Sequence, residues 1–276
     1  MRHAIIACSD QKCEDFLIHD WMRSLVDNVN RDNIDVIIID YGLSNDARAM
    51  LAQLGAITHS LPKDGAVSTQ RMKDIARIIR PSNYDQIMVC DAGDLIFQED
   101  ISHLFEQNKD AFRAACEGMA QPFGVYMKAS MVSSDVYKIK RVIKGKRMIN
   151  SGVMIAPREK LLALLEESDA MIKKNVWGAE QPVINYVFYR DGFVELPCGY
   201  NFAIATSTTP FYIEQSQFFF KDGVLIPIVH NIGRKNFLRP VSNFGYGAGK
   251  NRIKPMRYHL LRAIFMLTHL LYYILD

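Results

Sequence analysis

The chain has 276 residues, 49% of them hydrophobic and 23% charged, which is the composition of an ordinary globular protein large enough to bury a core. Its formal net charge of +3 is too small to suggest nucleic-acid binding. The five cysteines are scattered and odd in number, which favours reduced thiols in the cytoplasm over a disulfide framework. The early apolar run AIIAC is too short for a signal peptide, and no apolar run reaches the eighteen residues of a membrane span.

Short apolar runs alternate with longer segments of helical period along the first 240 residues. The expected helices cover residues 15–30, 44–55, 68–79 and 157–174. Strands separated by such helices predict βαβ units, and therefore an α/β fold with a mostly parallel, doubly wound sheet and helices on both faces. The expected strands are His3–Ser9, Asp35–Asp40, Gln86–Asp91, Ala111–Glu117, Ile149–Ala156 and Val224–His230.

Acidic residues stand at the ends of three of these strands, at Asp10, Asp40 and Asp91. Because ligands bind beyond the carboxyl ends of strands in such sheets, we expect an acidic rim there. In the stretch IMVCDAGDLIFQEDI, a second carboxylate, Asp94, follows Asp91 after an Ala-Gly pair. Two interpretations are open: the aspartates cap free backbone N–H groups in a turn, or they hold a divalent cation that bridges to phosphates.

Five blocks of sequence occur in a characteristic order over residues 3–237. They are HAIIACSDQKCEDFLIHDWMRSLVDN, YDQIMVCDAGDLIFQEDISHLF, INSGVMIAPREKLLALLE, GAEQPVINYVFYRDGFVELPCGYNF and IPIVHNIGRKNF. In this order they resemble GT-A-fold glycosyltransferases, closest to family 8, the group of glycogenin and the bacterial lipopolysaccharide galactosyl- and glucosyltransferases. The resemblance implies a GT-A (nucleotide-diphospho-sugar transferase) fold for residues 1–240, with a Rossmann-like, mostly parallel central sheet.

The resemblance also implies a donor site that contains a divalent metal. Asp91, Asp94 and His230 would be its ligands. Mn²⁺ is the first expectation, because an imidazole nitrogen suits an ion softer than Mg²⁺, and Mg²⁺ is the alternative. The sequence departs from the family at two points: D-x-x-D replaces D-x-D, and Lys235 stands five rather than six residues after His230. The residues that match the nucleotide- and diphosphate-binding positions are Ala7, Ser9, Asp10, Arg71, Asp91, Gly233 and Lys235.

On the sugar-facing side, the resemblance assigns Asn150, Glu180 and Gln181. Family 8 enzymes retain the anomeric configuration, and two mechanisms for retention are open. Glu180 could serve as the nucleophile of a double displacement. Alternatively, the leaving phosphate takes the acceptor's proton in a same-face attack, with Gln181 as an electrostatic stabiliser. A polar helix N-terminus with Pro182 at an early position accounts for the same residues locally.

The last segment, residues 241–276, differs in character from the rest. Its basic beginning, KNRIKPMR, leads into an apolar and aromatic run of sixteen residues from Leu260 to Leu275, short of the roughly 20 residues that a bilayer span needs. A basic lead before such a helix is typical of an interfacial anchor, and its packing on this domain or on a partner is the alternative. The anchor interpretation predicts a cytoplasmic protein that is peripheral at the inner face of the cell membrane.

These expectations combine into a metal-dependent, retaining glycosyltransferase. It would transfer a hexose from a nucleotide sugar, with UDP expected, to a glycan or lipid-linked saccharide, as in cell-surface polysaccharide or lipopolysaccharide synthesis. One alternative is a catalytically inactive GT-A domain that serves as a membrane-associated binding or scaffold subunit. Another is a sugar nucleotidyltransferase, but the first loop, CSDQKCEDF, lacks the glycine and arginine of those enzymes.

Overall fold

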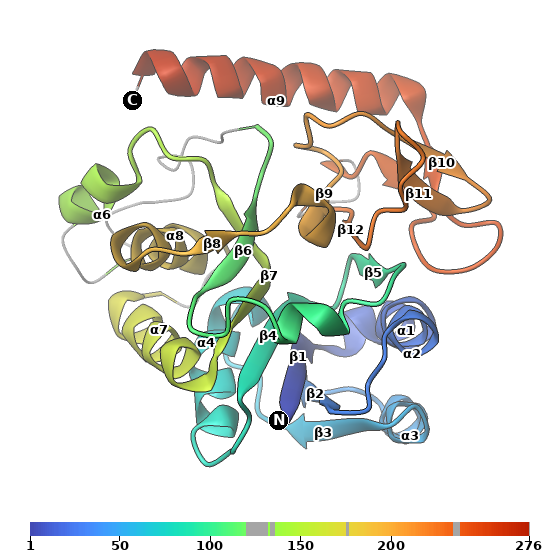
Figure 1. The fold of residues 1–276 in the computed structure, drawn as a ribbon, viewed down its shortest axis with the longest axis vertical. Helices are drawn as coiled ribbons and strands as arrows, with labels where there is room; N and C mark the ends of the chain where they lie inside the picture. The colour runs from blue at the N-terminus through green and yellow to red at the C-terminus, as the bar shows by residue number, and fades with distance from the viewer. Residues whose placement is uncertain (120–131, 133–135, 175–176, 234–237, 276) are drawn as a thin grey trace.

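The structure is a computed structural model of the chain, and it describes residues 1–276 except 120–131, 133–135, 175–176, 234–237 and 276. A seven-stranded sheet with the order β3-β2-β1-β4-β7-β6-β8 forms its centre, between two sets of helices (Figure 1). The strands are β1 His3–Ser9, β2 Ile34–Asp40, β3 Ala56–Ser60, β4 Gln86–Asp91, β6 Arg113–Cys116, β7 Ile149–Pro157 and β8 Val194–Glu195.

The sheet is mostly parallel, which confirms the predicted α/β class. Strands β3, β2, β1 and β4 pair in parallel, and β8 is parallel to β6. Only β7 runs against its neighbours β4 and β6 in this sheet of the described residues. The predicted bounds of β1 and β4 coincide with the observed ones, whereas the edge strand β3 was not predicted.

Two hydrophobic cores lie on the two faces of the sheet because successive strand residues point to opposite sides. Ile6 and Val89 belong to the core beneath α4, α6, α7 and α8, and Ile5 and Met88 belong to the core beneath η2, α2 and α3.

The helix predicted over residues 15–30 is divided into three pieces, with a π-helical turn, η2, in the middle. The helices are α1 Glu14–Phe16, η2 Leu17–Met22, α2 Arg23–Asn28, α3 Asn45–Gln53, α4 Val67–Ile79, α6 Val136–Ile143, α7 Arg158–Met171 and α8 Glu180–Asp191.

A smaller three-stranded sheet stands beside the central one, in the order β5-β12-β9. Its strands are β5 Leu95–Phe97, β9 Phe202–Ala203 and β12 Ile228–His230, and a hairpin of β10 Phe211–Glu214 and β11 Gln217–Phe220 packs nearby. The strand predicted over Val224–His230 is therefore shorter than expected and belongs to this second sheet. Short one-turn helices connect the elements: η1 Gln11–Cys13, η3 Ser102–Phe105 and η4 Cys198–Asn201.

The C-terminal segment begins with a small pair of strands, β13 Val241–Ser242 and β14 Arg252–Ile253, and ends in the helix α9 Pro255–Leu275, which runs along one end of the molecule (Figure 1). The strand pair is tied to the main body, because buried Asp20 of η2 lies 3.0 Å from Lys250 Nζ. Among the described residues, no helix combines the length and apolar character that crossing a bilayer requires. The division of the chain at residue 240 stays a prediction.

Candidate active site

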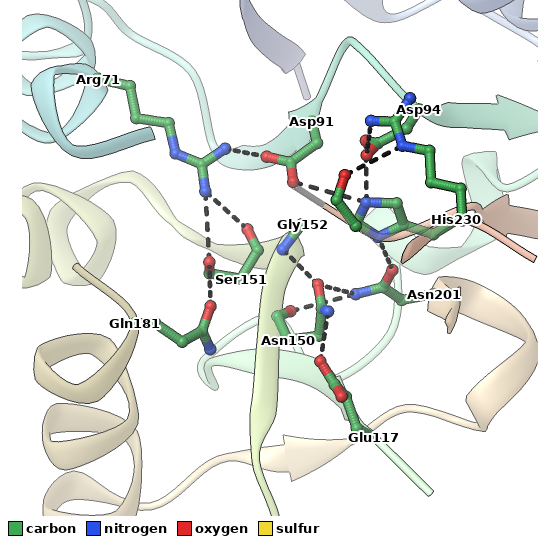
Figure 2. A network of polar contacts seen from close by, with 12 residues as sticks. Arg71, Asp91, Asp94, Glu117, Asn150, Ser151, Gly152, Gln181, Asn201 and His230 are labelled. Carbon is green, nitrogen blue, oxygen red and sulfur yellow. Dashed lines mark hydrogen bonds and ion pairs between the residues drawn. The ribbon is translucent and has the colours of Figure 1, made fainter. Parts of the chain in front are cut away.

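Three residues predicted as metal ligands meet where the two sheets adjoin. Asp91 ends β4, Asp94 directly precedes β5, and His230 ends β12. Because β12 pairs with β5 so that His230 lies opposite Leu95, the imidazole reaches Asp94. His230 Nε2 is 3.1 Å from Asp94 Oδ1 and 3.6 Å from Asp91 Oδ2 (Figure 2). One donor atom from each of the three side chains lies within 4.8 Å of the others.

His230 is oriented from behind by Asn201 of η4. Asn201 Nδ2 donates to Asn150 O and Oδ1, both at 3.1 Å, so its carbonyl oxygen accepts from His230 Nδ1 at 2.9 Å. A proton fixed on Nδ1 leaves Nε2 as the ligand nitrogen, the usual arrangement in metal-binding histidines. Two carboxylates and an imidazole nitrogen are donors that Mn²⁺ accepts. The residues therefore fit the predicted ion.

The pKa values of these side chains reflect their mutual charges. Burial would lower the pKa of His230, but Asp94, with Asp91 and Glu117 adding to it, raises the pKa above its ordinary value. Burial opposes the ionisation of Asp94, but His230 and Arg239 outweigh it and lower the pKa of that carboxyl. Both shifts favour an imidazolium paired with the Asp94 carboxylate in the metal-free site, and a bound metal ion would have to displace the Nε2 proton.

Two arginines lie against the carboxylates. Arg71 of α4 is 3% exposed, pairs with Asp91, and donates to Ser151 O at 3.2 Å and Ser151 Oγ at 3.3 Å. Burial would lower the pKa of Arg71, but its acidic neighbours, Asp91 first, raise it. Arg239 Nη2 lies 2.7 Å from Asp94 Oδ2, and no role was predicted for it from the sequence. Each carboxylate therefore has its own positive partner.

The Asn-Ser-Gly block of β7 packs directly against the imidazole. Gly152 has no room for a side chain, because a Cβ there would lie 2.3 Å from His230 Cε1 and 2.8 Å from Asn150 Oδ1. Asn150 Oδ1 accepts from Gly152 N at 2.8 Å, and Asn150 Nδ2 donates to Glu117 Oε1 at 2.7 Å. Burial raises the pKa of Glu117, against the hydrogen bond from Asn150. Sequence reasoning missed Glu117, although a carboxylate at the end of a predicted strand was the signal used elsewhere.

Glu180 and Gln181 begin α8 beside Arg71. Glu180 is 5% exposed and accepts from Thr69 Oγ1 at 2.9 Å. Burial raises the pKa of Glu180, against the opposing charge of Arg71. Gln181 Oε1 accepts from Ser151 Oγ at 2.8 Å, and Gln181 Nε2 donates to a backbone carbonyl of β7. A chain of polar contacts thus runs from Arg71 to α8, as Figure 2 shows.

A cavity of about 550 Å³ joins all of these groups. Its polar lining includes the three predicted metal ligands, both arginines, Asn150, Glu117, Glu180 and Gln181. Its apolar lining includes Trp177 and three residues of α9, Leu261, Ile264 and Phe265. Gly233 also lines the cavity, whereas Lys235 lies outside the described residues. This size and this mixed lining are typical of a small-molecule site.

Three of the residues predicted at nucleotide- and diphosphate-binding positions, Ala7, Ser9 and Asp10, lie in or directly after β1. Ala7 is fully buried and Ser9 is 2% exposed, while Asp10 Oδ2 lies 2.5 Å from Lys63 Nζ. Their assignment to a nucleotide stays a prediction. Asp40 ends β2 as expected, but its carboxylate is taken up by two backbone N–H groups, an arginine and a serine. The Asp40 carboxylate is therefore engaged within the protein, and the predicted acidic rim has fewer available carboxylates than the three strand ends indicated.

The fold is the GT-A type found in glycosyltransferases of known structure, as predicted. The chain is similar to galactosyltransferase LgtC, solved with donor and acceptor sugar analogs, with a TM-score of 0.54 and 15% identity over 95% of each chain. It is similar to the apo structure of the bifunctional glycosyltransferase WbbM, with a TM-score of 0.58 and 12% identity, covering 98% of this chain and 52% of that one. It is also similar to glycosyltransferase GlyE of Streptococcus pneumoniae TIGR4, with a TM-score of 0.55 and 15% identity, covering 99% of this chain and 63% of that one.

The chain thus spans about half of WbbM and less than two thirds of GlyE. At such identities the likeness is one of fold. No protein-family model matches the sequence, and no curated protein matches it.

Proposed function

We propose that the chain is a metal-dependent, retaining glycosyltransferase that transfers a hexose from a nucleotide sugar, with UDP as the expected nucleotide. The observation that carries the proposal is the meeting of Asp91, Asp94 and His230 in a cavity that also holds two arginines. Breaking a bond to a diphosphate leaves negative charge on the departing group, and fixed positive charge lowers the barrier for that step. A bound Mn²⁺ would supply this charge as a Lewis acid.

The chain's own residues would bind and orient the donor. Asp91, Asp94 and His230 would hold the ion, and Arg71, fixed by Ser151 and Asp91, would direct a second charge toward the diphosphate. Two acids and two amides that line the same cavity would supply hydrogen bonds for the sugar hydroxyls. They are Glu117, Asn150, Glu180 and Gln181.

Two routes to retention are consistent with these positions. A double displacement would use Glu180 as the nucleophile. Its carboxylate accepts a hydrogen bond from Thr69, and burial raises its pKa, so that it is ionised over a narrower pH range than an exposed glutamate. A same-face attack would need only a neutral side chain that stabilises the reacting centre electrostatically, which is the role proposed for Gln181. Glu180→Gln separates them: trapping of a glycosylated wild-type enzyme that the variant cannot form supports double displacement, and retained turnover in the variant supports same-face attack.

We further propose that the acceptor is a glycan or lipid-linked saccharide, and that the protein acts at the cytoplasmic face of the membrane. α9 carries apolar residues on both its sides. Leu261 is 4% exposed and lines the cavity, and Arg262 Nη1 donates to Ser207 O at 2.8 Å, so one side packs on the domain. Exposed apolar residues of α9 are Met256, Leu260, Ile264, Met266, Leu267, Leu270 and Leu271. Such a helix with a basic lead favours an anionic membrane surface.

Thermal unfolding with UDP, in the presence and absence of Mn²⁺, tests the proposed function. Stabilisation by UDP that requires Mn²⁺ is expected, because a ligand that binds the folded state raises apparent stability. Asp94→Asn and His230→Ala should each abolish the Mn²⁺-dependent part. If no nucleotide changes the melting temperature, an inactive GT-A domain that serves as a scaffold subunit becomes the better interpretation. If UDP with Mn²⁺ does stabilise the protein, a screen of sugar nucleotides for slow hydrolysis would identify the hexose.

A further inference from the structure

Arg239 is held at two points inside the candidate site. Its Nη2 lies 2.7 Å from Asp94 Oδ2, and its Nε donates to Gly233 O at 3.1 Å. The aliphatic stem crosses the backbone so closely that a Cβ on Gly233 would lie 3.0 Å from Arg239 Cγ. The glycine therefore permits the approach that brings the guanidinium to Asp94.

This contact competes with a metal ion for Asp94. Both carboxylate oxygens of Asp94 are engaged, Oδ1 by His230 and Oδ2 by Arg239. A dication held by the same carboxylate would stand next to the guanidinium charge, and like charges at such distances repel strongly in a partly buried site. Binding of the ion therefore favours departure of Arg239 from Asp94.

The two arginines differ in how free they are to move. Arg71 is 4% exposed in its side chain and has additional bonds to Ser151. The Arg239 side chain is 28% exposed, and its other bond goes to the backbone oxygen of Gly233, six residues earlier in the chain. Arg71 is thus a fixed cation, and Arg239 is the cation that can exchange partners.

We propose that Arg239 neutralises Asp94 in the metal-free site and moves to the donor's diphosphate when the ion binds. The inference rests on the proposed function, since it presupposes a metal and a diphosphate in this cavity. Its consequence is cooperative binding: the ion releases the guanidinium that the diphosphate needs, and the diphosphate offers that guanidinium a new partner. By linkage, each ligand then raises the affinity for the other by the same factor.

Arg239→Gln tests the inference because it predicts two effects of opposite sign. Mn²⁺ alone should bind more tightly, since its competitor is gone, and inorganic pyrophosphate at saturating Mn²⁺ should bind more weakly. Each change should be at least about fivefold, the lower end of typical coupling between sites. Binding of Mn²⁺ is measured from the electron paramagnetic resonance signal of the free ion, and binding of pyrophosphate at micromolar concentration by calorimetry. Because pyrophosphate carries no nucleoside, the result does not depend on which nucleotide base the donor contains.

Two further variants make the result specific. Arg23→Gln removes one arginine and one ion pair, with Asp27 at 3.0 Å on the surface of α2, and should change neither affinity. Arg239→Lys keeps the charge and should bind Mn²⁺ within a factor of about two of the wild type, which is below the range of typical coupling between sites. Circular dichroism and the melting temperature establish that each variant is folded.

The outcomes separate the inference from the proposed function. If the wild-type protein binds Mn²⁺ and pyrophosphate but Arg239→Gln behaves like Arg23→Gln, the partner exchange is refuted and the proposed function stands. If Arg239→Gln weakens both ligands, Arg239 supports the site without competing for Asp94, and the inference is again refuted. If the wild-type protein binds neither ligand, the proposed function fails and the inference fails with it.

Discussion

Replacing Gly152 by alanine would press a methyl group into the imidazole of His230. The new Cβ would lie 2.3 Å from His230 Cε1, about 1.1 Å short of the 3.4 Å at which ordinary contacts begin. The ring cannot yield easily, because it is 2% exposed and bonded to Asn201 behind it and Asp94 in front. Overpacking of this kind costs about 1–3 kcal/mol of stability.

The larger effect of Gly152→Ala should fall on the ion. Disturbing the support of a metal-binding histidine lowers metal affinity by about 10–100-fold, so Mn²⁺-dependent stabilisation by UDP should disappear at concentrations that saturate the wild type. Gly223→Ala is the matched control. Gly223 has φ +90° and nothing within 4 Å of an added Cβ, so it adds backbone strain of about 1–2 kcal/mol away from the site. Wild-type Mn²⁺ affinity in Gly152→Ala, measured by titration calorimetry, would show that the imidazole does not hold the ion in this geometry.

Three other predictions follow from the same contacts. Asn201→Ala should lower Mn²⁺ affinity by about 10–100-fold in the same calorimetric assay, because His230 Nδ1 loses its acceptor, and an unchanged affinity would contradict the proposed orientation. The pKa of His230 is raised in the folded protein, so the contribution of His230 to the stability of the metal-free protein should be complete below about pH 6.5 and be lost as the pH rises through the folded pKa. The affinity for Mn²⁺ should increase over the same pH range. Urea unfolding at a series of pH values measures the stability, and His230→Gln should remove its pH dependence. A chain that ends at Lys254, which keeps the strand pair with Asn251 but lacks α9, should no longer sediment with anionic vesicles; continued sedimentation of the truncated chain would place the membrane contact elsewhere.

The regular elements were largely predictable because their patterns are strong. β1 and β4 are continuous apolar runs bounded by polar residues, and their observed bounds match the predicted ones. β3 was missed because its residues, Ala-Ile-Thr-His-Ser, lie at the sheet edge with most side chains partly or fully exposed. The reversed direction of β7 and the separate sheet of β12 depend on strand pairing across long sequence distances, which periodicity does not report.

The site was predictable where residue type and strand position coincide. Asp91 and Asp94 were proposed in this way, and His230 through the order of the sequence blocks, and the structure brings the three side chains together. Arg239 stands nine residues after His230, beyond the last block, and only the folded loop brings it to Asp94. Asn201 lay within a block without an assigned part, because an amide that orients a histidine has no pattern of its own.

The two halves of the candidate ion site belong to different sheets. Asp91 is at the carboxyl end of β4 in the large sheet, and His230 belongs to the small sheet, whose strands β5 and β12 share only three residue pairs. A metal ion bound by residues of both sheets would link the two sheets at their junction. Amide hydrogens along β5 and β12 should then exchange with solvent more slowly when the ion is bound, so that hydrogen exchange at this junction measures the occupancy of the site.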